Sequence, residues 1–176
     1  MDIREFDFTS DLEGVRTCLI ELQDYECGLD SRMPAGVEVV DPLFAEMMAR
    51  CAAFNGRILV AAAGPEIAGY VTVLTRVESE DVEDGGLAYG LVTDLMVRET
   101  FRNQGVGRRL LEAAEAYAAG CGVRWLRVEV LAQNHGARGL YSSFGFSEHI
   151  VSLEKKLSST GNRSRVQAGG SGRNPV

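Results

Sequence analysis

A glycine-containing turn follows an apolar strand and opens a helix in the second half of the chain. Backbone N–H groups at a helix start lack partners within the helix and lie at the positive end of its dipole. Glycine has no Cβ, so phosphate oxygens can approach the backbone closely at Gly105 and Gly107. The turn therefore predicts an anion site suited to a pyrophosphate. Its candidate binding residues are Arg102, Asn103, Gln104, Gly105, Val106, Gly107 and Arg108.

Two familiar phosphate loops do not fit this turn. A dinucleotide-binding fingerprint requires a third glycine where this chain has Leu110, and a P-loop requires Gly-Lys-Ser/Thr, whereas Gly107 precedes Arg108. A helix that merely starts at a glycine pair, with no bound anion, remains the structural alternative. The rest of the sequence has to decide between the two interpretations.

A second motif runs from Asn134 to Phe146 and contains Leu140-Tyr141 and Gly145-Phe146. Together with the Arg-x-x-Gly-x-Gly pattern of residues 102–107, it resembles the GNAT N-acetyltransferase superfamily. The turn is similar to that family's acetyl-CoA pyrophosphate loop, and the second motif to its Asn…Ala…Leu-Tyr…Gly-Phe signature. The order of elements is also similar over residues 1–157. The resemblance points to cofactor and reaction type, and much less to the acceptor.

The resemblance implies an α/β (α+β) fold with a mixed, mostly antiparallel, six- to seven-stranded sheet flanked by helices. Its central parallel strands, residues 88–97 and 125–131, splay apart to admit the pantetheine arm of acetyl-CoA. Backbone groups of Leu95, Met96 and Val97 pair with that arm, and one N–H stabilises the oxyanion. The resemblance further implies that Asn134 contacts the pantetheine or ribose side. It also implies that Tyr141 borders the cofactor and is the general acid that protonates the CoA sulfur.

The reaction also needs a base, because an alkyl amine has a pKa of about 10 and arrives protonated. Asp94 is the nearest carboxylate, inside an otherwise apolar strand. Strand alternation predicts that it shares a face with Val92 and Met96, opposite Thr93 and Leu95. Some small-molecule amine acetyltransferases of the family carry an acidic pair here, and Thr93 replaces its first member. A water as the base, or a purely structural Asp94, are the alternatives.

The charge distribution favours a cationic acceptor. The chain has 18 basic and 25 acidic side chains, and every charged residue after Glu154 is basic, so residues 1–154 carry a net charge of −12. Such a body repels phosphate backbones, which argues against nucleic acid as a partner. We expect the acceptor to lie against Glu21, Asp24, Tyr25 and Asp94, with the acidic loop 78–84 nearby. An acidic surface that serves only solubility is the alternative.

Periodicity and turn residues place the elements. A strand over residues 1–8 precedes a helix capped by Ser10; a loop over residues 30–41 precedes a helix with Pro42 in its first turn. Strands over 57–63, 67–77 and 88–97 follow, then a helix over 106–120, a strand over 125–131, a short helix over 135–144 and a strand over 146–157. The predicted core contacts near the end are Trp125, Ile150, Leu153 and Leu157.

One acetyltransferase domain is therefore expected over residues 1–157, followed by a disordered Gly/Ser/Arg tail over 158–176. Neither a signal peptide nor a membrane span is indicated, and four cysteines without a Cys-x-x-Cys pair suggest free thiols in the cytoplasm. The two histidines, His135 and His149, have no partners at metal-ligand spacing, so no metal is expected. A homodimer is expected by family analogy alone.

The sequence thus predicts an acetyl-CoA-dependent N-acetyltransferase that transfers the acetyl group directly to a primary amine in a ternary complex. No nucleophilic Ser or Cys motif indicates a covalent acetyl-enzyme. A small cationic amine is the preferred acceptor, and a protein Lys or N-terminus is the alternative. A non-catalytic acyl-CoA-binding regulatory module is the rival from another class.

Overall fold

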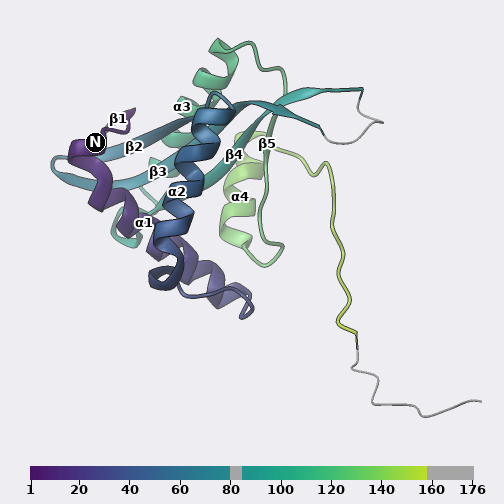
Figure 1. Ribbon diagram of the computed structural model, residues 1–176, viewed down its shortest axis with the longest axis horizontal. Coiled ribbons are helices and arrows are strands. Elements are labelled where there is room, and N and C mark those ends of the chain that lie inside the picture. The colour runs from purple at the N-terminus through teal and green to yellow at the C-terminus, as the bar shows by residue number, and fades with distance from the viewer. Residues whose placement is uncertain (80–84, 158–176) are drawn as a thin grey trace, which may run out of the picture.

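The fold is a mixed sheet with helices on both faces, as the sequence predicts (Figure 1). The computed structural model describes residues 1–79 and 85–157; within them the sheet has five strands in the order β1-β2-β3-β4-β5. Neighbouring strands are antiparallel except β4 and β5, which are parallel. Part of the predicted acidic loop, residues 80–84, and the predicted tail, residues 158–176, lie outside the described residues. The elements are β1 (Asp2–Glu5), α1 (Phe8–Leu29), α2 (Gly36–Ala53), β2 (Arg57–Ala63), β3 (Glu66–Glu78), β4 (Ala88–Val97), η2 (Glu99–Phe101), α3 (Val106–Gly120), β5 (Leu126–Val128) and α4 (His135–Phe144).

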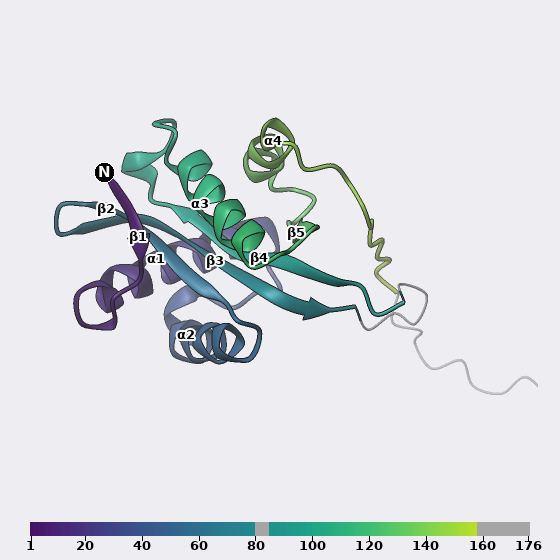
Figure 2. The ribbon, with the colours of Figure 1, turned by 90° about the horizontal axis from the view of Figure 1, so that it is seen from above.

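Two apolar clusters hold the helices against opposite faces of the sheet (Figure 2). On one face, α1 and α2 pack against β3 and β4 around Val15, Met47 and Tyr70. On the other face, α3 and α4 pack around Leu110 and Tyr141. The buried positions of α3 recur every three or four residues, which gives the helix one apolar stripe. The sheet therefore separates an α1/α2 side from an α3/α4 side.

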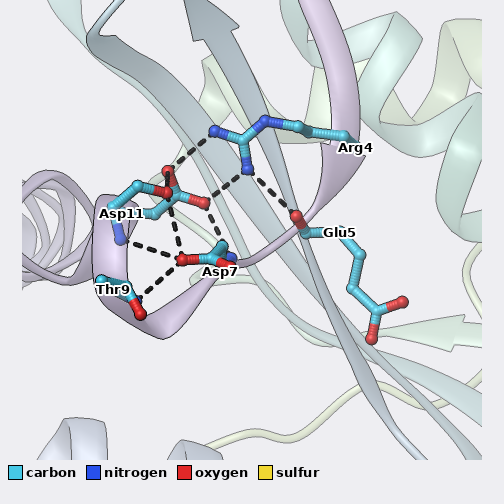
Figure 3. A network of polar contacts seen from close by, with 6 residues as sticks. Arg4, Glu5, Asp7, Thr9 and Asp11 are labelled. Atoms are coloured by element: carbon cyan, nitrogen blue, oxygen red, sulfur yellow. Dashed lines mark hydrogen bonds and ion pairs between the residues drawn. The ribbon is translucent and has the colours of Figure 1, made fainter.

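The start of α1 is fixed by a carboxylate network (Figure 3). Asp7, and not the predicted Ser10, is the N-cap: its carboxylate accepts the N–H groups of Thr9 and Ser10 at 2.9 and 3.0 Å. One turn later Asp11 is 2% exposed and accepts two hydrogen bonds from the Arg4 guanidinium, at 2.6 and 2.8 Å. Asp and Ser are both favourable N-cap residues, so the N-cap is set by whichever side-chain oxygen lies within reach of the free N–H groups of the first turn, here the Asp7 carboxylate.

Helix α2 starts earlier than predicted, at Gly36, and Pro42 lies inside it. The Asp24 carboxylate accepts the Gly36 N–H at 2.7 Å and so holds the helix start to the end of α1. A Cβ on residue 36 would lie 2.5 Å from the Ile20 carbonyl oxygen, so only glycine permits this close approach. The prediction of a loop over 30–41 was wrong because these contacts between helices outweigh the loss of one hydrogen bond at Pro42.

A β-bulge in β4 reverses the predicted alternation of its side chains. Thr72 of β3 pairs with Asp94, whereas Val73 pairs with Val92, so Thr93 is an extra residue. Val92 consequently packs in the α3/α4 cluster, while Met96 packs in the α1/α2 cluster. The expectation that Val92 shares a face with Asp94 is therefore wrong. The bulge turns Asp94 towards α1 and α2.

The parallel strands separate just beyond this bulge. β5 pairs with β4 only at Gly90, Leu91 and Val92. Leu95, Met96 and Val97 pair with β3 on one side and have no β5 partner on the other. The fold thus has the splayed parallel strands that the resemblance implies.

Residues 146–157 do not form the predicted last strand. The segment is extended and has no sheet partner among the described residues. Ile150, Leu153 and Leu157, predicted as core contacts, are 72%, 90% and 80% exposed, and Trp125 is 64% exposed. A strand needs a neighbour for its backbone groups, and this segment leaves α4 in a direction away from the sheet (Figure 1, Figure 2). The expectation of six or seven strands is corrected to five.

Candidate active site

The N-terminus of α3 exposes a run of backbone donors. Gly105 is the N-cap, in the left-handed region at φ 77°, and no side chain caps the helix. Asn103 also has a positive φ, 60°. The Arg109 N–H donates to the Gly105 carbonyl at 3.1 Å, which is the first helical hydrogen bond, so the donors of Val106, Gly107 and Arg108 precede it. These donors and the helix dipole favour an anion at this turn.

A groove of about 470 Å³ joins this turn to the splayed end of β4 and to α4. Residues predicted from two separate motifs therefore line one cavity. Of the predicted cofactor residues, Gln104 does not line it, because its side chain donates to the Thr100 carbonyl at 2.9 Å. The lining includes Leu95, Met96, Val97, Arg102, Asn103, Gly105, Val106, Gly107, Arg108, Asn134 and Tyr141.

The two predicted phosphate-binding arginines make other contacts in this structure. Arg102 Nε donates to the Val97 carbonyl at 2.9 Å, at the backbone edge that β5 leaves unpaired. Arg108 donates to the Ser143 carbonyl at 3.0 Å, and its guanidinium lies 5.6 Å from the Phe144 ring centroid. A ligand that pairs with the Val97 carbonyl must therefore displace Arg102. Both arginines are exposed enough to turn towards a phosphate.

Asp94 lies on the α1/α2 side of the bulge, and its carboxylate is partly buried. Thr93 Oγ1 donates to Asp94 Oδ2 at 2.7 Å. Burial raises the pKa of Asp94 above its ordinary value, although the hydrogen bonds from Thr93 and Thr72 act in the opposite direction. A carboxyl with a raised pKa is a better proton acceptor than an ordinary aspartate.

Glu26 is an acidic residue near the site that the sequence did not single out as a candidate. It lies in the last turn of α1, half-buried, and both burial and the charge of Asp94 raise its pKa. Burial raises the pKa of the Tyr70 and Tyr141 phenols, and the charges of Glu26 and Asp94 act in the same direction. The Tyr70 hydroxyl is fully buried and has no hydrogen-bond partner in the described part of the chain. Only the packing of α1 over β3 and β4 reveals this grouping of acidic and phenolic side chains.

Tyr141 lies in α4 with 8% of its surface exposed, and it lines the groove. Its ring packs edge-on against Phe146, with centroids 5.7 Å apart. Burial raises its pKa to about 12, and the charges of Glu26 and Asp94 act in the same direction. The phenol is therefore protonated at neutral pH, as a general acid must be.

Asn134 and Tyr25 meet across the groove from α4 and α1. Asn134 Oδ1 caps α4 by accepting the Ala137 N–H at 3.0 Å, and it also accepts the Tyr25 hydroxyl at 3.4 Å. The Tyr25 ring lies 5.7 Å from the Arg102 guanidinium. Tyr25 thus lies between the groove and a neighbouring cavity, and lines both.

Of the other three predicted acceptor contacts, Glu21 and Asp24 line that neighbouring cavity, which measures about 440 Å³, and Asp94 lines neither of the two. Glu21 forms an ion pair with Arg98 at 3.0 Å, and Asp24 holds the start of α2. Arg98 also pairs with Glu66 at 2.7 Å. The structure thus places Glu21 and Asp24 beside the groove, with their carboxylates already engaged by protein donors.

A sequence model of the acetyltransferase (GNAT) family matches residues 25–146, more than half of the chain. The chain belongs to this family. Among curated relatives, the uncharacterized N-acetyltransferase YycN of Bacillus subtilis is 36% identical over 66 residues, which are 38% of this chain and 42% of that protein. The curated relatives match over about half of their own length or less.

Solved structures agree on the GNAT fold. A mutant of the BH1408 protein from Bacillus halodurans superposes with a TM-score of 0.78 at 22% identity, covering 89% of this chain and 99% of that one. The aminoglycoside N-acetyltransferase AAC(6')-Iy, solved in complex with CoA, superposes with a TM-score of 0.61 at 18% identity, covering 89% and 100%. At these identities the likeness concerns the fold alone.

The matched stretch of this GNAT protein runs from Tyr25 to the residue after Gly145, and so contains nearly all of the groove lining. In the part of the chain that the structure describes, no helix is long and apolar enough to cross a membrane. Within residues 1–79 and 85–157, no group of three or more His, Cys, Asp or Glu side chains is placed to hold a metal ion.

Proposed function

We propose that this protein is an N-acetyltransferase that transfers the acetyl group of acetyl-CoA to a primary amine by direct attack in a ternary complex. The observation that carries the proposal is the single groove that joins the donor-rich start of α3, the unpaired edge of β4 and the Tyr141 side chain. An anion site, a strand edge and a protonated acid are the three features that a phosphate-bearing thioester requires.

Acetyl-CoA would bind with its pyrophosphate at Gly105, Gly107 and Arg108. Its pantetheine arm would pair with the backbone of Leu95 to Val97, because that edge lacks a β5 partner. Arg102 would leave the Val97 carbonyl and turn towards the phosphates. A CoA-bound structure of AAC(6')-Iy, which shares the fold, supports this placement by likeness.

The reaction would begin with loss of a proton from the ammonium group to Asp94, directly or through a water. The neutral amine nitrogen then attacks the thioester carbonyl carbon, and the backbone N–H of Val97, on the unpaired edge of β4, stabilises the oxyanion. The Met96 N–H, which an oxyanion site with two donors would also use, points to β3 instead. The intermediate collapses with cleavage of the C–S bond, and Tyr141 gives its proton to the departing sulfur. The products are the acetylated amine and CoA.

A covalent acetyl-cysteine is not part of this scheme. All four cysteines are free, and Cys18 is fully buried. Burial raises the pKa of Cys18 to about 12 and of Cys51 to about 11, so neither is a thiolate at neutral pH. Free thiols also fit the reducing cytoplasm in which we propose that the enzyme works.

We propose a small cationic amine as the acceptor. The charges of Asp94 and Glu26 both act on Tyr141, which lines the groove, and a cation bound nearby would relieve the repulsion between the two carboxyl groups. A pocket of this sign concentrates amines and repels anionic substrates. An ammonium group bound there lies next to the proposed base.

The test is release of the CoA thiol from acetyl-CoA with a panel of acceptors: a polyamine, an aminoglycoside, a neutral amino acid and a lysine-containing peptide. We expect turnover with the polyamine or aminoglycoside, weakening as salt increases. Turnover on the peptide alone would move the acceptor to proteins. CoA binding without turnover on any amine would overturn the enzymatic proposal in favour of a regulatory module.

A further inference from the structure

The side chain of Arg102 occupies the strand edge at the splayed end of β4. Arg102 follows the short helix η2, and its Nε donates to the Val97 carbonyl at 2.9 Å. Successive residues of a strand turn their backbone groups to opposite sides, and the next residue, Arg98, donates its N–H to Ala68 of β3. The Val97 carbonyl therefore lies on the edge without a β5 partner, where a pantetheine amide would pair with it.

A second contact holds the Arg102 guanidinium at this edge. The Tyr25 ring, in α1, lies 5.7 Å from it, and an aromatic face attracts a cation. The Tyr25 hydroxyl donates to Asn134 Oδ1 at 3.4 Å on the other side of the groove. Within residues 1–79 and 85–157, Arg102 pairs with no carboxylate. Its positive charge is thus held at the edge by two neutral groups, a carbonyl and a ring.

A phosphate is a better partner for this guanidinium than a carbonyl. Arg102 lines the same groove as the donor-rich turn at Gly105 and Gly107. A hydrogen bond between a guanidinium and an anion is stronger than one to a neutral carbonyl. A ligand with a pyrophosphate at this turn therefore draws Arg102 away from Val97 and uncovers the carbonyl for its own pantetheine arm. A ligand with the arm and no phosphate must displace Arg102 without that compensation.

We propose, on the basis of the function proposed above, that Arg102 is a gate that selects the acyl donor. It leaves the Val97 carbonyl for thioesters that carry a pyrophosphate, and it keeps that carbonyl covered against pantetheine thioesters that carry none. Tyr25 is the positioning residue of this gate, because its ring stabilises the arrangement in which Arg102 covers the strand edge. The donor is thereby selected by its phosphates before its acyl group reaches Tyr141.

Arg108 provides a matched comparison, because it lines the same groove and also follows the glycine turn. It donates to the Ser143 carbonyl at 3.0 Å, and its guanidinium lies 5.6 Å from the Phe144 ring centroid. Both partners belong to α4 and not to the edge of β4. Removal of Arg108 therefore takes away a positive charge alone, whereas removal of Arg102 takes away a positive charge and uncovers the Val97 carbonyl.

The test is titration calorimetry with two probes, CoA and pantetheine, which has no phosphate. Arg102→Ala should bind CoA about tenfold more weakly than the parent protein and pantetheine about threefold more tightly. Arg108→Ala should bind CoA more weakly and pantetheine with unchanged affinity. Because both arginines are exposed, the two variants should keep the circular dichroism spectrum of the parent.

The role of Tyr25 is tested with the same probes. Tyr25→Leu removes the ring that holds Arg102 at the edge and should bind both probes about threefold more tightly. Tyr25→Phe keeps the ring and should bind CoA within about twofold of the parent protein. A side chain that merely contacts the ligand would give the opposite sign for Tyr25→Leu, namely weaker binding.

The gate and the proposed function fail in different ways. If the parent protein binds CoA and Arg102→Ala gains no affinity for pantetheine, the gate is overturned and the cofactor site stands. If Tyr25→Leu binds both probes more weakly, Tyr25 has no positioning role. If the parent protein does not bind CoA, the proposed function is overturned, and the gate with it.

Discussion

Replacing Tyr141 with phenylalanine separates the chemical role of this side chain from its structural role. The ring belongs to the α3/α4 core, and its edge contact with Phe146 does not involve the hydroxyl. Tyr141→Phe should therefore change the free energy of unfolding by less than about 1 kcal/mol. Loss of the general acid should lower kcat by about 10² to 10⁴, which corresponds to about 3 to 5 kcal/mol of transition-state stabilisation.

The matched control is Tyr117→Phe. The Tyr117 hydroxyl donates to the Asn55 carbonyl at 2.9 Å, and Tyr117 does not line the groove. This variant should lose about 1 kcal/mol of stability and keep its turnover, the reverse of the expected pattern for Tyr141→Phe. Thiol release gives kcat, CoA titration calorimetry gives the cofactor affinity, and urea unfolding gives the stability.

The pH profile adds an independent check on Tyr141. Because its pKa is raised to about 12, the acid stays protonated across the usual assay range, and kcat should show no falling limb from this group below about pH 11. An unchanged kcat in Tyr141→Phe, with acetyl transfer still limiting the rate, would remove Tyr141 from the role of acid.

Three further predictions concern the base, the phosphate turn and the fold. Asp94→Asn should lower kcat about 10² to 10⁴-fold. In the parent enzyme, kcat should rise as the pH rises through the raised pKa of Asp94. A variant that retains this rising limb would exclude Asp94 as the base. Gly105→Ala should weaken CoA binding about tenfold by calorimetry, because φ is 77° there; Gly64→Ala, at φ 65° in the β2–β3 turn, should cost similar stability and leave CoA affinity unchanged. The hydrogen bonds from Arg4 lower the pKa of Asp11 from 3.8 to about 2, so Asp11 should contribute about 2 kcal/mol to the free energy of unfolding above pH 3.8. This contribution should disappear as the pH falls through 2. Asp11→Asn should flatten that part of the curve of unfolding free energy against pH, and an unaltered curve would contradict the assignment.

Local sequence signals were sufficient wherever a motif and a regular element coincide. The helix starts at Val106 and His135 follow from the glycine turn and from Asn134, and both agree with the structure. The residues of the two motifs also line one groove, because α3 and α4 pack on the same face of the sheet.

Interactions between distant segments were not accessible in this way. The bulge at Thr93 puts Val92 on the face of the sheet opposite to the one that regular alternation predicts. Alternation of apolar and polar residues gives no sign of such a bulge. The ion pair of Glu21 with Arg98, and the effect of the Asp94 charge on the pKa of Glu26, exist only because α1 packs over β4. Residues 146–157 have the composition of a strand, but in the described part of the chain they pair with no other strand.

The most direct test of direct acetyl transfer is a rapid-quench experiment with protein, acetyl-CoA and a polyamine at comparable concentrations, analysed by mass spectrometry. Direct transfer should give acetylated polyamine and free CoA in equal amounts, with no acetyl group on the protein at any time and negligible CoA release when the amine is omitted. An acetylated protein that later passes its acetyl group to the amine would contradict it, as would CoA release that does not depend on the amine.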